Sequence, residues 1–196
     1  MTTYEILSFI VDALVMIAGF SAIVIYWHQR RAKVKTAATV ILSQIDSIEA
    51  TVTGLRKNQK TNVTIYKSKV VLDINHWVNS IYLLSRKLGG DNVRLIDVFY
   101  EQAEEIEKSR SAVCHELVIA WDHKDYFLQK KIAECFDMDE HERKKTLHLF
   151  SVNFEQNGDL FDPSLPKEIL DENLMQFRFL SGTTAYEKLK KISYHS

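Results

Sequence analysis

One apolar stretch near the start of the chain constrains its fold more than any other feature. Between Ile6 and Trp27 the only charged side chain is Asp12. As an α-helix this stretch would span about 33 Å, close to the thickness of the hydrocarbon core of a bilayer. A buried core helix of this kind would need a larger protein around it. The sequence therefore predicts a transmembrane helix over residues 1–28.

The charges that flank this stretch predict its orientation. No lysine or arginine precedes it, and four follow it closely: Arg30, Arg31, Lys33 and Lys35. A cleaved signal peptide carries its positive charge before the apolar region, so this order argues against one. The positive-inside rule places the N-terminus outside and the rest of the chain in the cytoplasm. We therefore expect a single-pass protein of the cell inner membrane, with these four side chains at the lipid headgroups.

A regular apolar seam follows the basic cluster. Its members alternate at intervals of four and three residues: Val34, Ala38, Ile41, Ile45, Ile48, Val52 and Leu55. The same register extends back into the apolar stretch, which predicts one continuous helix that includes a basic neck over residues 29–57. Two explanations fit the seam equally well. It is either the core of a parallel coiled-coil oligomer or the face on which a long helix packs against its own domain.

The rest of the chain, residues 58–196, has the pattern of a helical domain. Apolar residues at three- and four-residue spacing predict helices over 64–88, 92–121 and on to about 136, with a break at 122–125. Asp139 with Glu142, and Thr184 with Glu187, resemble capping boxes at the starts of later helices. Pro166 fits the first turn of another helix, and Gly89 and Gly182 fit helix ends. No segment alternates like a β-strand. The predicted fold class is all-α: one N-terminal transmembrane helix that continues into a cytoplasmic helical bundle.

Small and polar residues share one face of the predicted membrane helix. Ser8, Asp12 and Gly19 follow the spacing of a single helix face. Small residues allow membrane helices to approach closely, and an intramembrane carboxylate usually faces a helix bundle or water. This face predicts a homo-oligomer interface or a pore lining. The alternative is that Asp12 lies near the outer membrane surface and has no such role.

Charge is divided unevenly along the chain, although the total is near zero. Residues 30–90 carry 11 basic and 3 acidic side chains, whereas residues 91–175 carry 10 basic and 20 acidic ones. Five basic residues bracket the first predicted loop: Arg56, Lys57, Lys60, Lys67 and Lys69. Such a cluster suits a phosphate-bearing ligand, and a short or cyclic oligonucleotide could also stack its bases on Tyr66 or Trp77. The alternatives are a solvated face or pairing with the acidic half of the chain or of a neighbouring subunit.

One pattern indicates an enzyme. Arg110 with His115, and Arg143 with His148, form two R-x4-H pairs. This pattern resembles the catalytic signature of HEPN-type ribonucleases, which implies helical bundles that pair arginine and histidine from two subunits across RNA. No nucleophile, metal-binding or nucleotide-loop motif accompanies it, so we expect no metal and no cofactor.

The layout of the chain resembles the small single-pass membrane effectors of bacterial anti-phage systems. That resemblance implies a non-enzymatic, oligomeric channel or pore that opens when a nucleotide or protein signal reaches the cytoplasmic domain. It also implies a partner protein that produces the signal. The alternatives are a membrane-tethered ribonuclease that uses the R-x4-H residues and a membrane scaffold without enzymatic activity.

Overall fold

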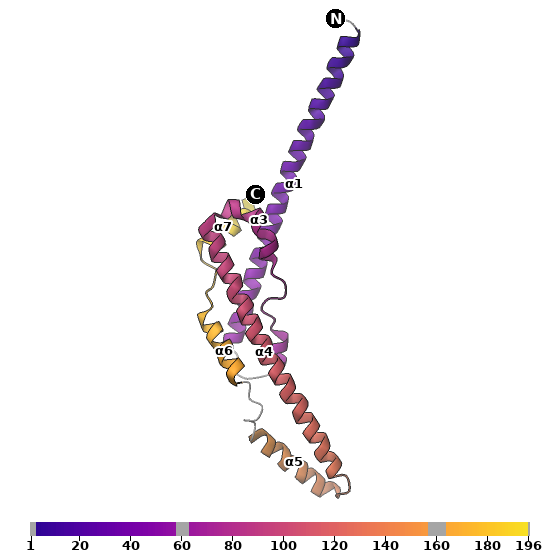
Figure 1. Cartoon of the computed structure of the whole chain (residues 1–196), viewed down its shortest axis with the longest axis vertical. Helices are drawn as coiled ribbons and strands as arrows, with labels where there is room; N and C mark the ends of the chain where they lie inside the picture. Colours follow the sequence, from indigo (N-terminus) through magenta and orange to yellow (C-terminus); the bar gives the residue numbers. More distant parts are fainter. Residues whose placement is uncertain (1–2, 58–62, 157–163, 196) are drawn as a thin grey trace. The chain divides into compact units, whose positions relative to one another are not determined.

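The regular elements of the described chain are all α-helices, which confirms the all-α prediction (Figure 1). The computed structural model describes the backbone of residues 3–57, 63–156 and 164–195, and side chains at 14–57, 64–150, 152 and 165–194. The helices are α1 (Thr3–Lys57), α2 (Val63–Ser68), α3 (His76–Leu88), α4 (Gly90–Glu134), α5 (Glu140–Gln156), α6 (Ser164–Gln176) and α7 (Thr184–His195).

The chain divides into two compact units. Unit 1 contains residues 1–46, 75–98 and 180–196, and unit 2 contains residues 47–74 and 99–179. Helices α1 and α4 contribute residues to both units, so each unit is assembled from segments that are distant in the sequence.

Helix α1 is a single helix of 55 residues (Figure 1), which confirms the continuous helix predicted from the apolar spacing. The side chains of Ser8 and Asp12 lie outside the described part of the chain. Within the described residues, no helix is both long enough and apolar enough to cross a membrane.

The apolar seam of α1 is buried by the chain itself. In unit 1 its members Val34, Ala38, Ile41 and Ile45 are buried, and in unit 2 Ile48, Val52 and Leu55 are buried. The second explanation of the seam, a long helix that packs on its own domain, is therefore the one that this structure supports. A parallel coiled coil would need this same face, so the seam no longer argues for an oligomer.

Unit 1 packs α3 and α7 with the first parts of α1 and α4. Gly89 ends α3 with a φ of 80°, and its N–H donates to the Ser85 carbonyl at 3.0 Å. Two side chains, those of buried Asn92 and of Lys188, donate to the Leu88 carbonyl nearby. These contacts satisfy a helix-end carbonyl that would otherwise lack a partner and so join the end of α3 to α4 and α7.

Unit 2 packs α6 against α4 and joins the end of α1 to the end of α6. Its core contains an aromatic cluster in which the rings of Phe99 and Phe177 lie 5.2 Å apart. The buried Ser109 of α4 accepts a hydrogen bond from Asn173 of α6 at 2.8 Å. Gln102 of α4 also accepts from the backbone N–H of Arg178 at 3.1 Å. Apolar burial and these polar contacts together fix α6 on α4.

Three local predictions need correction. Residues 64–88 do not form one helix, because residues 69–75 are not helical and Asn75 caps α3 by accepting from the N–H groups of Trp77 and Val78. The break expected at 122–125 is absent, since α4 continues to Glu134. The cap of α7 is Thr183, whose hydroxyl accepts from the N–H of Tyr186, and not Thr184.

The structure confirms the other predicted helix starts and ends. Asp139 caps α5 by accepting from the N–H groups of His141 and Glu142. Pro166 lies in the first turn of α6, and Gly182, with a φ of 83°, separates α6 from α7.

Candidate functional site

The stretch of α1 from Leu14 to Trp27, here called the apolar segment, exposes its side chains on every side of the helix. Its large apolar side chains are between 56% and 73% exposed. A Cβ atom added at Gly19 would meet no atom within 4 Å apart from its chain neighbours and the backbone of its own helix. The described part of unit 1 therefore leaves this segment uncovered. Of the predicted interface residues, Gly19 alone has a described side-chain environment, and that environment is open space.

The serine within the apolar segment is satisfied inside the helix. The hydroxyl of Ser21 donates to the Ile17 carbonyl at 2.8 Å. A serine that bonds back to the preceding turn needs no water or partner chain to complete its hydrogen bonding. The Ser21 hydroxyl therefore adds no unsatisfied polar group to the surface of the segment.

A basic cavity of about 290 Å³ lies where the apolar segment ends. It is lined by Trp27, Arg30, Arg31 and Val34 of α1 and by Lys87 in the last turn of α3. The four α1 residues follow i, i+3, i+4, i+7 spacing and share one helix face. The guanidinium carbon of Arg31 lies 5.8 Å from the centre of the Trp27 ring, at cation–π distance. Of the described residues that line this cavity, three are cationic and none is a carboxylate.

Two of the four basic residues that were predicted to meet lipid headgroups line this cavity, and two do not. Arg30 and Arg31 line it, whereas Lys33 and Lys35 are exposed and do not. Lys87 was not included in the prediction. Its place in a basic last turn of a helix was visible in the sequence, but its approach to α1 depends on how α3 packs, which the sequence does not show.

Arg56, predicted to bind a phosphate, holds the end of α6 within unit 2. Its Nε donates to the Leu174 carbonyl at 2.8 Å, and its Nη2 donates to the carbonyls of Leu174 and Phe177. Its guanidinium also lies 5.0 Å from the centre of the Phe179 ring. An arginine that binds the last carbonyls of a helix acts as a C-terminal cap. Its geometry is that of a structural residue.

The lysines of the same predicted cluster are described only in part. Lys57 and Lys67 are exposed, and Lys60 lies outside the described residues. The Nζ of Lys69 lies 3.4 Å from the position that a Cβ on Gly54 would occupy, so this side chain lies along α1.

The two aromatic residues expected to stack on bases are buried instead. Tyr66 is buried in unit 2, and Trp77 is buried in unit 1, where its indole N–H donates to Asp97. Burial also raises the pKa of the Tyr66 hydroxyl above its usual value. Neither ring is placed to stack on a ligand.

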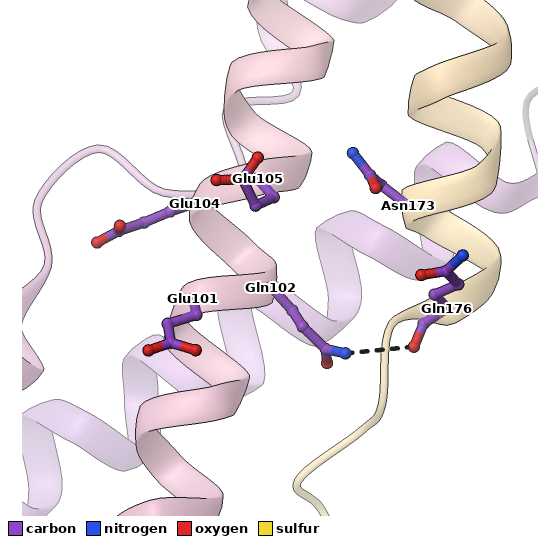
Figure 2. Close-up of a pocket in the computed structure, with 6 residues that line it drawn as sticks. All are labelled: Glu101, Gln102, Glu104, Glu105, Asn173 and Gln176. Atoms are coloured by element: carbon purple, nitrogen blue, oxygen red, sulfur yellow. Dashed lines mark hydrogen bonds between the residues drawn. The ribbon is translucent and has the colours of Figure 1, made fainter.

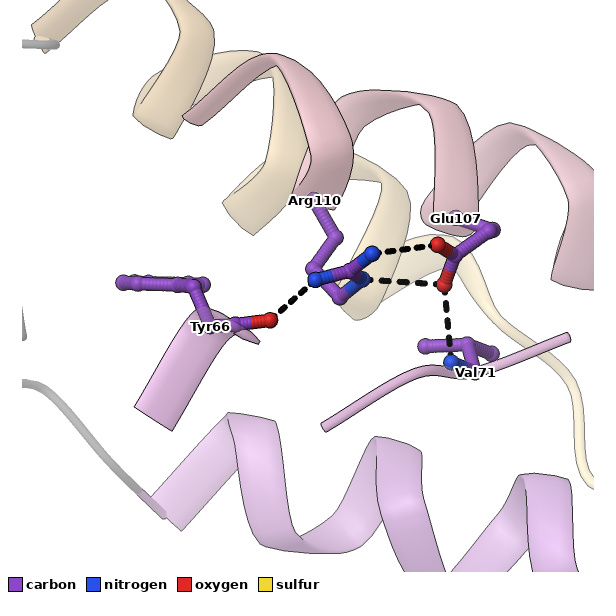
Figure 3. Close-up of polar contacts among 4 residues, drawn as sticks. All are labelled: Tyr66, Val71, Glu107 and Arg110. Atoms are coloured by element: carbon purple, nitrogen blue, oxygen red, sulfur yellow. Dashed lines mark hydrogen bonds and ion pairs between the residues drawn. The ribbon is translucent and has the colours of Figure 1, made fainter. Parts of the chain in front are cut away.

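Arg110, the first arginine of the R-x4-H pairs, is buried in a polar cluster of unit 2 (Figure 3). It makes two hydrogen bonds to the Glu107 carboxylate and donates to the Tyr66 carbonyl. Glu107 in turn accepts from the backbone N–H of Val71 at 2.8 Å. The hydrogen bond to Glu107 raises the pKa of Arg110 above its usual value, so the guanidinium stays charged. This cluster fixes the non-helical segment after α2 on α4.

The geometry does not bring Arg110 and His115 together on α4. Residues five apart on an α-helix differ by about 140° around its axis. Accordingly, Arg110 is buried and His115 is exposed. In α5, Arg143 is half-buried and His148 is exposed. The ribonuclease alternative needs an arginine whose donors face solvent. The arginine of the first R-x4-H pair, Arg110, does not meet this requirement.

A polar pocket of about 400 Å³ lies between α4 and α6 of unit 2 (Figure 2). Glu101, Glu104 and Glu105 line it from α4, together with three amide side chains: Gln102, Asn173 and Gln176. Gln102 donates across it to the Gln176 carbonyl at 3.4 Å. The sequence alone does not show that α6 packs beside these glutamates. The acceptors of this pocket suit a cationic group more than a phosphate.

Among the described residues, no group of three or more His, Cys, Asp or Glu side chains is placed to hold a metal ion. Comparison with protein-family models, with curated proteins and with solved structures finds no match to this chain.

Proposed function

We propose that the chain is a single-pass membrane protein, anchored by the N-terminal part of α1 and carrying its helical units in the cytoplasm. The observation that supports this proposal is the exposure of the apolar segment around the full circumference of the helix. Soluble monomers rarely leave a continuous apolar surface of this kind in water. An α-helix satisfies its own backbone hydrogen bonds, so lipid can cover it without further partners.

The proposed span extends from the apolar segment back to Ile6, because residues 6–13 continue the same apolar composition. Together they form a stretch of the length that a bilayer requires. The cations after Trp27 support the orientation with the N-terminus outside.

Cysteine labelling in intact cells tests both the anchor and its orientation. Cys114 and Cys135 are first replaced by alanine, and single cysteines are then introduced at Thr3 or at Ser196. A membrane-impermeant maleimide should label the Thr3 position and not the Ser196 position. The reverse pattern contradicts the orientation, and release of the protein from membranes by alkaline carbonate contradicts the anchor.

We propose as a second step that α1 associates with copies of itself and that the assembly acts as a channel-forming effector in anti-phage defence. The observation that favours association is the open surface at Gly19, where a second helix can approach closely. The layout of the chain supports the channel and its role in defence. A phosphate-bearing ligand would then meet the exposed Lys57 and Lys67, without Arg56.

Ion flux separates this channel from a membrane scaffold. Liposomes that contain the purified protein should lose an ion gradient, reported by a trapped ion-sensitive fluorophore, and Gly19→Leu should reduce this ion flux by blocking close helix approach. Ala22→Leu adds similar bulk one helical turn further on and, if the contact is centred on Gly19, should have a smaller effect. A protein that inserts, remains monomeric in mild detergents and conducts no ions is a scaffold.

A further inference from the structure

We propose that the basic cavity between α1 and α3 binds the phosphate of an anionic phospholipid headgroup. This inference rests on the proposed membrane anchor and adds to it a defined lipid site. The site is made by Trp27, Arg30 and Arg31 on α1 and by Lys87 on α3.

The chemistry of the lining suits a phosphate diester. Arginine guanidinium groups offer paired donors that match phosphate oxygens, and a lysine ammonium adds a compact third charge. Among the described residues, none of those that line the cavity carries a carboxylate. Its volume of about 290 Å³ lies just below the range for small-molecule sites, about 300–1,000 Å³, which fits a headgroup better than a large ligand.

The position of the cavity favours a lipid over a phosphate from solution. Trp27 is both the last residue of the apolar segment and part of the cavity lining. Tryptophan is enriched at membrane surfaces, where its ring lies at headgroup depth. A lipid whose acyl chains lie along the apolar segment would therefore bring its phosphate to Arg30 and Arg31.

Two neighbouring lysines supply internal controls. Lys33 and Lys35 are on the same helix and at similar distance along it, yet they do not line the cavity. A general attraction between basic residues and an anionic surface would use all of these charges about equally. A defined site predicts that Lys87, which is distant in the sequence, matters more than Lys33.

The test uses the full-length protein in a neutral detergent, where no anionic surface potential acts. Native mass spectrometry measures binding of dioleoylphosphatidylglycerol in competition with dioleoylphosphatidylcholine. The wild-type chain should retain the anionic lipid preferentially. Lys87→Gln should weaken this binding about tenfold, as expected for the loss of one charge-assisted hydrogen bond, whereas Lys33→Gln should change it less than about twofold.

Arg31→Gln provides a second variant that removes a cation without altering α3, and it should also weaken binding about tenfold. Circular dichroism checks that each variant keeps the helicity of the wild type. Equal retention of both lipids by the wild type, or equal losses in Lys87→Gln and Lys33→Gln, would overturn the site.

A further arm distinguishes the source of the phosphate. Millimolar glycerol 1-phosphate should not displace the bound lipid, because it lacks acyl chains to lie along the apolar segment. Full displacement would show that the cavity takes a soluble phosphate and would overturn the lipid assignment. Carbonate extraction from phosphatidylcholine vesicles reports the anchor separately, because these vesicles contain no anionic lipid.

Discussion

The two parts of α1 share one apolar spacing and have opposite surroundings. The seam register contains Ile17, Phe20 and Val24 in the first part, all exposed, and Ile41 and Ile45 in the second part, both fully buried. The difference lies on the other faces of the helix. In the first part of α1 the faces outside the seam are also apolar. In the second part those faces carry lysine, threonine, serine and glutamine.

This contrast shows what decides the partner of a helix. A helix with one apolar stripe buries that stripe against its own chain and leaves its polar side in water. A helix that is apolar on all sides cannot do so with one neighbour, and a bilayer covers it on every side at once. The spacing alone predicts a helix in both parts, but the full circumference distinguishes the two surroundings.

The largest expected effect comes from placing a carboxylate in the buried part. Ile41→Asp should lower the free energy of unfolding by about 4–5 kcal/mol, because it leaves a charged group without a partner in the core. Urea unfolding in detergent, followed by circular dichroism, measures this change. Ile17→Asp is the matched control and should leave unfolding of the two units within about 0.5 kcal/mol of the wild type. Equal destabilisation by both substitutions would contradict the difference in burial between the two parts of α1.

The same two substitutions should reverse their order in a membrane-insertion assay. Ile17→Asp should raise the apparent free energy of insertion by about 2.5–3.5 kcal/mol, because it places a carboxylate in the hydrocarbon region. Ile41→Asp lies beyond the proposed span and should not change insertion. Glycosylation mapping of the nascent chain in microsomes gives the inserted fraction. Unchanged insertion of the Ile17 variant would argue against lipid around this part of α1.

A smaller effect is expected at the end of the buried part, where Arg56 caps α6. Arg56→Met keeps much of the side-chain length but removes the hydrogen bonds to the Leu174 and Phe177 carbonyls. It should cost about 1–3 kcal/mol of unfolding free energy. Lys57→Met, at the exposed neighbouring position, is the control and should be nearly neutral. A neutral Arg56→Met would return this arginine to the list of ligand candidates.

The sequence allowed the helical class, the continuous α1 and most helix ends to be predicted, because these depend on local chemistry. Gly89, Asp139 and Gly182 mark helix ends by capping and by backbone freedom, which neighbouring residues determine. The helix break before α3 was missed because the apolar spacing continues through it. The cap at Asn75 and the hydrogen bond from Val71 to Glu107 override that spacing.

The candidate sites were harder to predict, because they depend on which helices pack together. Arg30 and Arg31 were identified from their place after the apolar stretch, but Lys87 reaches them only through the packing of α3 on α1. Arg56 and Arg110 looked like free cations in the sequence. Arg56 donates to the carbonyl of Leu174 and Arg110 to that of Tyr66, and both carbonyls lie far away along the chain. Only the pairing of Arg110 with Glu107, three residues earlier on the same helix, is local.

Spin labels along α1 test the central claim most directly. In a background without Cys114 and Cys135, labels replace Ile17, Phe20 and Val24 in the apolar segment and Thr39, Ser43 and Ser47 on the exposed polar face of the later part. The protein is reconstituted in liposomes, and collision rates with oxygen and with a water-soluble nickel chelate are measured. The first three labels should collide with oxygen and not with nickel, and the last three should show the reverse. Free access of the nickel chelate to labels at all six positions would contradict the membrane anchor.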